Sequence, residues 1–186
     1  MTTLFIVIAC SLFAGLAMAL GAVFAYFEKI DNQLIEDELR HGITAFGAGA
    51  LLSAVALVLV PEGIENLMPL TASIWFIAGG ICFMLLDIFL KKINTPASQL
   101  AAMLSDFIPE SIALGAAFAT GNSNAFLLAA LIALQNLPEG FSAYRELNST
   151  AAYKPKKIIL MFALMAVLGP ISGISGYLWL SEFPQA

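Results

Sequence analysis

Two pairs of polar side chains recur at the same spacing in apolar surroundings. Asp106 and Glu110 are four residues apart, and so are Gln135 and Glu139. Residues at positions i and i+4 share one face of an α-helix, so each pair projects to one side, one turn apart. Ionisable groups inside an apolar segment are costly and by default mark a pathway or a site. Both pairs are therefore candidates for a polar site, to which Asn136 adds a second amide.

A proline precedes the glutamate of each pair: Pro109 stands before Glu110, and Pro138 before Glu139. Because proline cannot donate to the carbonyl four residues back, each helix is expected to kink and to free one backbone carbonyl. Freed carbonyls beside carboxylates are oxygen ligands that suit a hard cation. At membrane depth, such irregular backbone survives only where protein or a watery cavity covers it.

The elements that hold these side chains belong to a chain too apolar for a water-soluble fold. Of its 186 residues, 60% are hydrophobic and 11% are charged, whereas soluble domains are about 45–50% apolar and about 25% charged. A helix of about 20 apolar residues crosses the hydrocarbon layer. The sequence thus predicts an all-α polytopic membrane protein, a single transmembrane domain over residues 1–186. The six expected spans are about 4–27, 42–60, 72–90, 100–120, 125–144 and 158–180.

The basic residues predict the orientation. All eight fall in the first, third and fifth connections between spans, and positive charge in short loops stays on the cytoplasmic side. We therefore expect the N-terminus outside and the basic loops in the cytoplasm, in the plasma membrane or, in a bacterium, the inner membrane. The first span lacks the basic leader of a signal peptide and is expected to be a retained helix. The eight residues are Lys29, Arg40, Lys91, Lys92, Arg145, Lys154, Lys156 and Lys157.

The fourth and fifth spans should bring the two polar pairs to the same depth. They are expected to be antiparallel neighbours joined by a turn at 121–124. Counted from the centre of that turn, Asp106 is level with Glu139, and Glu110 with Gln135. At about 1.5 Å per residue these levels lie roughly 25 and 19 Å from the outer turn, in the inner half of the bilayer. We expect the four side chains to converge on one volume.

Three carboxylates gathered in one volume cannot all stay ionised without a counter-charge, because like charges disfavour one another's ionised form. No Lys or Arg occurs in the core of any expected span, so the counter-charge is a bound cation or protons. This pattern indicates cation transport or at least cation binding. The alternative is a protonated, hydrogen-bonded network that only shapes the bundle.

Other polar residues have plainer interpretations. Asp87 stands four residues before Lys91, which predicts an ion pair at a helix end. Glu62 and Glu65 follow the second span outside, as solvated acids or as an entrance that attracts cations. Three glycine pairs are expected to allow close helix approach. They are Gly47 with Gly49, Gly79 with Gly80, and Gly173 with Gly176. No nucleophile–base constellation, phosphate loop or nucleotide motif is present, so neither an enzyme nor a nucleic-acid partner is expected.

The fifth span resembles the ZIP (Zrt/Irt-like) family of divalent metal transporters. Residues 135–140, Gln-Asn-Leu-Pro-Glu-Gly, match the family's His/Gln-Asn/Asp-x-Pro-Glu-Gly pattern. Residues 106–115 are a degraded form of its fourth-helix pattern, His-Asn-x-Pro-Asp/Glu-Gly with a trailing Ala-Leu-Gly, and residues 45–62 look like its second helix. The similarity covers essentially the whole chain, and the outside N-terminus agrees with family topology.

The resemblance implies a ZIP-like helix bundle with a pore-lining metal site, often two adjacent sites, between the fourth and fifth helices. It implies inward transport by alternating access of a divalent cation (Zn, Mn, Fe or Cd) as substrate, with no cofactor. The bilayer and the cation are the expected partners. Carried over by position, the ligands are Asp106, Glu110, Gln135, Asn136 and Glu139.

This chain departs from the family pattern at several positions. Asp106 and Phe107 replace the usual His-Asn, Ser111 replaces a glycine, and Gly169 stands where the sixth helix often has glutamate. An oxygen-rich ligand set favours Mn²⁺, Mg²⁺ or Fe²⁺ over Zn²⁺. Losing a bridging ligand would reduce two metal positions to one.

The family usually has eight spans, and six are expected here. Either the natural protein continues past Ala186 or this is a shortened homologue, which would need a second copy of the chain to transport. Two other functions stay open: a transport-inactive ZIP-like membrane scaffold, and a proton-coupled carrier of another small solute.

Overall fold

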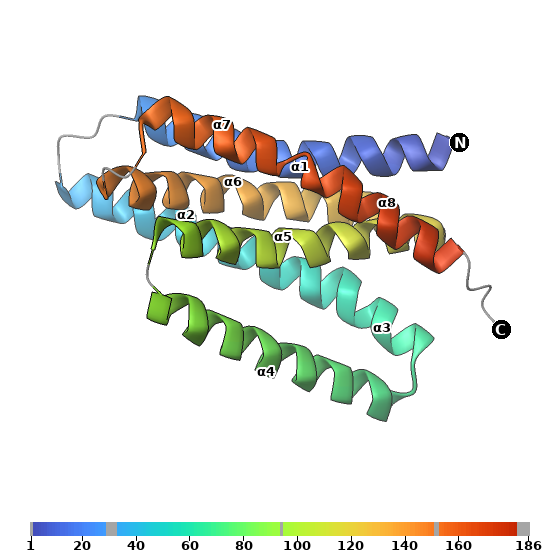
Figure 1. Cartoon of the computed structure of the whole chain (residues 1–186). Helices are drawn as coiled ribbons and strands as arrows, with labels where there is room; N and C mark the ends of the chain where they lie inside the picture. Colours follow the sequence, from blue (N-terminus) through green and yellow to red (C-terminus); the bar gives the residue numbers. More distant parts are fainter. Residues whose placement is uncertain (1, 29–32, 94, 151–152, 182–186) are drawn as a thin grey trace.

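The computed structural model describes residues 2–28, 33–93, 95–150 and 153–181. Over these residues the chain forms a helical bundle, and six of its helical stretches are long and apolar enough to cross a membrane. The predicted all-α polytopic fold is confirmed. The first residues of α1 and the last of α8 lie at the same end of the bundle (Figure 1). The elements are α1 (Thr2–Phe27), α2 (Gln33–Ala54), a π-helical turn (Val55–Leu59), α3 (Val60–Asn66), α4 (Pro69–Ile93), α5 (Pro96–Ala119), α6 (Ala125–Ser149), α7 (Pro155–Met165) and α8 (Leu168–Ser181).

The second span is longer than predicted. Helix α2, the π-helical turn and α3 form one stretch, Leu34–Glu65. Residues 33–41 and 61–66 were expected in polar connections but are helical. An acidic residue in the first turn, Glu36, favours a helix start because it faces the positive end of the helix dipole. The remaining part of the first connection, 29–32, lies outside the described residues.

The sixth span is broken into α7 and α8 at residues 166 and 167. Pro170 lacks the N–H that would bond the carbonyl of Ala166 in a continuous helix. The N–H of Gly169 donates to that carbonyl instead, at 3.2 Å. This tighter turn redirects the chain, so that α8 crosses toward α5 while α7 lies along α1 (Figure 1).

Glycines bring α1 and α6 into backbone contact. A Cβ at Gly21 would lie 2.0 Å from the carbonyl oxygen of Leu137, and one at Gly140 would lie 2.1 Å from that of Met18. Small residues allow such an approach because no side chain keeps the backbones apart. Helix α6 is consequently held against α1 on both sides of Glu139.

Helices α5 and α8 meet in the same way. A Cβ at Gly115 would lie 1.9 Å from the carbonyl oxygen of Gly173, and one at Gly176 would lie 2.1 Å from that of Ile112. The close-approach prediction is therefore confirmed for Gly173 and Gly176. It is also confirmed for Gly47, whose Cβ would lie 2.8 Å from the ring of Pro138.

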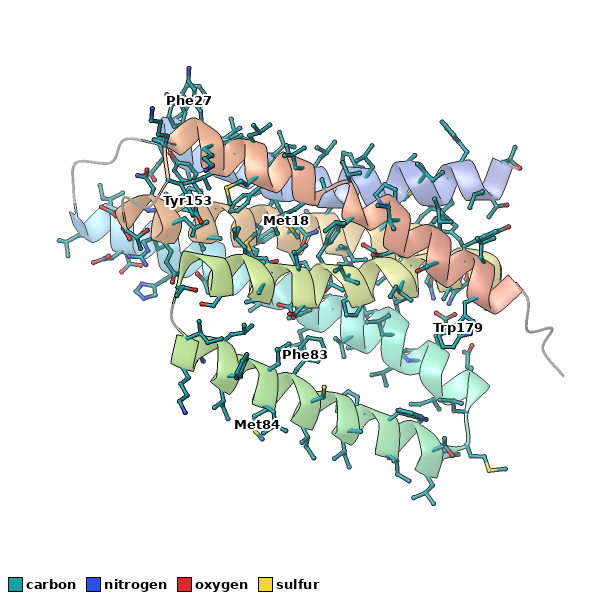
Figure 2. All side chains as sticks on the ribbon, viewed as in Figure 1. Met18, Phe27, Phe83, Met84, Tyr153 and Trp179 are labelled. Atoms are coloured by element: carbon teal, nitrogen blue, oxygen red, sulfur yellow. The ribbon has the colours of Figure 1, made fainter. Side chains whose placement is uncertain are left out.

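The same prediction is wrong for Gly49, Gly79 and Gly80, where an added Cβ meets nothing within 4 Å. The last two belong to α4, which lies at the edge of the bundle and has no buried residue (Figures 1 and 2). Most of its apolar side chains are exposed, with Phe76 66% and Phe89 59% exposed. A helix that is apolar all round needs protein or lipid around it. Because no other described part of the chain buries α4, its apolar surface is suited to contact with lipid.

We predict that Gly140→Ala destabilises the fold by about 1–3 kcal/mol, since the added methyl group must push α6 away from α1. Thermal unfolding in detergent measures the effect. Gly79→Ala is the matched control, because the new methyl group meets open space on another apolar helix. Equal melting temperatures for the two variants would contradict the close packing of α1 and α6.

Candidate functional site

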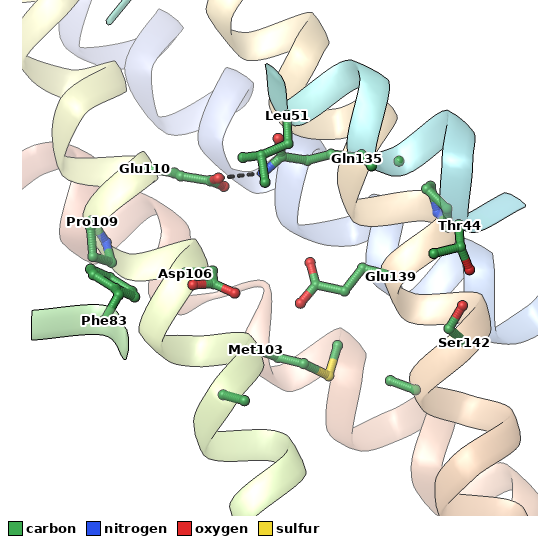
Figure 3. A pocket seen from close by; sticks show the side chains of 15 residues that line it. Thr44, Leu51, Phe83, Met103, Asp106, Pro109, Glu110, Gln135, Glu139 and Ser142 are labelled. Atoms are coloured by element: carbon green, nitrogen blue, oxygen red, sulfur yellow. Dashed lines mark hydrogen bonds between the residues drawn. The ribbon is translucent and has the colours of Figure 1, made fainter. Parts of the chain in front are cut away.

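A pocket of about 540 Å³ lies among α2, α4, α5 and α6. Four of the side chains predicted to form the polar site line it: Asp106, Glu110, Gln135 and Glu139. Figure 3 shows the carboxylates of Asp106 and Glu139 pointing toward each other across the space between α5 and α6. The structure thus gathers two residues from each helix, as the level count predicts.

Glu110 and Gln135 are joined directly. The amide Nε2 of Gln135 donates a hydrogen bond to Oε1 of Glu110 (Figure 3). This bond crosses between α5 and α6, so it confirms that these two residues lie at the same level. Because Nε2 of Gln135 faces the Glu110 carboxylate, the amide oxygen of Gln135 is turned away from that carboxylate.

Two oxygens of this bonded pair lack a partner among the described residues. Glu110 Oε2 and Gln135 Oε1 are both buried and accept no hydrogen bond. Leaving a buried acceptor unsatisfied costs about 1–3 kcal/mol, more for a charged group. Both atoms are acceptors, so neither can satisfy the other. A hydrogen-bond donor or a cation bound beside the pair would satisfy these two oxygens.

No basic residue occurs among the described residues that line this pocket. The carboxylates therefore have no cationic side chain within the pocket to balance them. Across the described ranges, no three His, Cys, Asp or Glu side chains stand close enough to enclose a metal ion. The acids surround a roomy space instead of converging on one point, so a cation there would keep water ligands or draw the side chains inward.

Asn136 lies apart from the other predicted ligands. It is fully buried, and its Nδ2 donates to the carbonyl oxygen of Ala14 on α1 at 2.9 Å. It does not line the pocket. Successive helical residues are about 100° apart, so when Gln135 faces α5, Asn136 turns toward α1. Of the five residues carried over by position, four line the pocket and Asn136 does not.

Phe107 lies on a different side of α5 from its neighbour Asp106, which lines the pocket. It is fully buried. A Cβ added at Gly15 or at Gly169 would lie 2.7 Å from its Cζ, so the ring fills the space between α1 and α8. Two of the residues that depart from the family pattern, Phe107 and Gly169, thus lie in contact. This arrangement leaves no room on that side of the carboxylates for a second group of ligands.

Pro109 and Pro138 both lie inside their helices without ending them, and both line the pocket. The kinks themselves stay a prediction. The lining also includes residues that sequence reasoning missed, among them Thr44, Phe83 and Ser142. Of these three, only Ser142 could have been predicted from the sequence, because it follows Glu139 by three residues and shares its helix face.

Glu62 and Glu65 line a second pocket of about 330 Å³, between α3 and the α5–α6 turn. The hydroxyl of Thr120 donates to Oε1 of Glu62 at 3.2 Å. The two acids belong to helix α3, not to a loop. This pocket is separate from the first and shares no lining residue with it.

The ion pair predicted at the end of the third span is confirmed. Lys91 Nζ lies 2.8 Å from Asp87 Oδ2, and both side chains are mostly exposed. Asp87 therefore has its own partner and does not line the pocket.

No family model matches the chain, and no curated protein matches it. The ZIP-like resemblance consequently depends on the motifs in the sequence.

We predict that thiol labelling separates neighbouring residues of one helix. In a background where Cys10 and Cys82 are serine, Asp106→Cys should react with a small hydrophilic thiol reagent, because Asp106 is exposed in the pocket. Phe107→Cys should stay unlabelled, because Phe107 is fully buried. Labelling of both cysteines in folded protein, monitored by mass spectrometry, would contradict the placement of α5.

Proposed function

We propose that this chain carries divalent metal cations across a membrane through the pocket between α5 and α6. The observation that carries the proposal is the set of acceptors around this pocket. Three carboxylates from two helices face it, and two buried oxygens of the Glu110–Gln135 pair have no donor among the described residues. A divalent cation supplies the missing positive charge where no lining side chain does.

The ligands would be Asp106, Glu110, Glu139 and the amide oxygen of Gln135. All four are oxygen donors, which favour Mn²⁺, Mg²⁺ or Fe²⁺ over Zn²⁺. Hard cations commonly retain water when the protein supplies few ligands. The open arrangement fits such a partly hydrated cation. Phe107 fills the neighbouring space, so a single cation position is proposed.

The division of ligands between α5 and α6 suggests how a cation would leave. Two of the ligands belong to α5, which is packed against α8, and two to α6, which is packed against α1. A relative shift of the two helix pairs separates the carboxylates and weakens their hold on the cation. This is the requirement of alternating access, in which one site is exposed first to one side and then to the other.

The proposed path runs from the Glu62–Glu65 pocket to the carboxylates. With the N-terminus outside, that pocket lies at the outer end, where two acids raise the local concentration of cations. Thr44 and Ser142 line the main pocket beyond Glu139 and would offer hydroxyl ligands toward the cytoplasm.

We predict that Asp106→Asn and Glu139→Gln each weaken Mn²⁺ or Cd²⁺ uptake into proteoliposomes. Changes to groups that merely support a metal ligand lower affinity roughly 10–100-fold, and loss of a charged ligand should do at least as much. Asp87→Asn is the matched control, because it removes an exposed acid that is paired outside the pocket. Asn136→Ala should lower stability by about 1 kcal/mol through its lost hydrogen bond while leaving cation affinity unchanged.

The other possible results of the uptake experiment would indicate different functions. Uptake that is unaffected by both acidic substitutions excludes the proposed site. Absence of uptake in folded, reconstituted protein favours a transport-inactive scaffold. A proton gradient that drives uptake of a non-metal solute supports a proton-coupled carrier, since protons could also balance the carboxylates.

We predict, from the distribution of Lys and Arg, that the start of α1 is outside and the α4–α5 connection is cytoplasmic. In the cysteine-free background, Thr2→Cys should react in intact cells with a reagent that does not cross membranes. Lys92→Cys should react only after permeabilisation. Both positions are exposed, so access to the reagent depends only on the side of the membrane. The reverse pattern would overturn the proposed direction of the path.

A further inference from the structure

One basic side chain joins three helices near the pocket. Arg145 on α6 donates through Nη1 to Oε2 of Glu28 at 2.6 Å, and through Nη2 to Oε1 of Glu36. Glu28 directly follows α1, and Glu36 is in the first turn of α2. Arg145 also lies over the ring of Phe141, 5.7 Å from its centroid. We name Arg145, Glu28 and Glu36 the inner clamp.

The inner clamp is partly shielded from solvent. Its side chains are 24%, 16% and 29% exposed, whereas those of the Lys91–Asp87 pair are 76% and 59% exposed. Exposed pairs contribute little, because water competes for both charges. Removing one partner of a shielded pair leaves the other charge poorly solvated, and here it would leave two carboxylates together. The clamp is therefore the stronger tie.

The clamp stands just below the pocket. Arg145 follows the lining residue Ser142 by three positions, which is about one helical turn. It follows Glu139 by six positions, less than two turns. The helices that it joins, α1 and α2, are the ones that hold α6 in place: Gly21 of α1 meets the backbone of α6 at Leu137, and Gly47 of α2 meets the ring of Pro138.

We propose that Arg145 is a positioning residue for the cation site, an inference that rests on the proposed function. By joining the inner ends of α1, α2 and α6, it makes them one wall of the pocket and fixes where Glu139 and Gln135 stand. Helix α5, with Asp106 and Glu110, is the opposite wall and contributes no residue to the clamp. The spacing between the walls, and hence cation affinity, depends on Arg145 although it does not touch the cation.

The geometry requires arginine. A guanidinium presents its N–H groups as a planar fork that can serve two carboxylates at once, while a lysine ammonium acts as a single compact charge. Arg145→Lys should therefore recover only part of the function, and Arg145→Gln, which keeps polarity without charge, should recover less. Exchanging the charges, with Arg145→Glu and Glu36→Arg together, rebuilds the tie between α2 and α6.

The experiment compares Arg145→Gln with Lys91→Gln, which removes a basic residue from an exposed pair. Cd²⁺ binding to purified protein in detergent is followed by calorimetry, and amide hydrogen exchange is followed over the first turns of α2. For Arg145→Gln we expect roughly tenfold weaker Cd²⁺ binding, the size of effect typical of groups that orient metal ligands, and faster exchange at the start of α2. Lys91→Gln should match the parent protein in both measurements.

The outcomes separate this inference from the proposed function. If the parent protein does not bind Cd²⁺, the proposed function fails. If it binds and Arg145→Gln binds equally well, only the positioning role fails, even when exchange at α2 is faster. Should Arg145→Gln not fold, the charge exchange decides: recovered binding supports the clamp, and folded protein with binding still weakened overturns it.

Discussion

The charge of three carboxylates inside an apolar bundle is the constraint on which the rest of the structure depends. Asp106, Glu110 and Glu139 face one pocket, and no basic residue lines it within the described chain. Charges interact strongly in a low-dielectric interior, so this group is costly unless something balances it. Gln135 donates a hydrogen bond to one oxygen of Glu110, and the other oxygen has no donor among the described residues. Protons or a bound cation would supply the balancing charge.

Glycines hold together the helices that carry the carboxylates. Backbone contacts at glycines join α1 to α6 and α5 to α8. The carboxylates are thus divided between two tightly packed pairs of helices. The two pairs also meet closely, because a Cβ at Gly169 of α8 would lie 2.7 Å from the carbonyl oxygen of Ser11 on α1. Phe107, set between Gly15 and Gly169, fills the space between α1 and α8, whereas the two carboxylates of α5 face the pocket.

Sequence reasoning predicts the features that follow from periodicity and from a short turn. The i, i+4 spacing and the 121–124 turn are enough to bring Glu110 opposite Gln135. The same reasoning places Asn136 in the site, because a motif gives residue types but not the direction of each side chain. The 100° step between neighbours turns it to α1. Some glycine contacts are also missed: Gly49 and Gly140 look alike in sequence, and only the fold decides which one meets another backbone.

The inner clamp shows how one residue can serve both topology and packing. Arg145 is one of eight basic residues whose one-sided distribution predicts the orientation, a rule that depends only on the side of the membrane where the charge lies. The fold places this charge between two glutamates from other helices. One guanidinium and two carboxylates leave a net negative group beside the inner end of the pocket. In the proposed transport, a lone arginine there would repel a departing cation, whereas the clamp joins three helices and leaves a net negative charge at the end of the pocket that is proposed to face the cytoplasm.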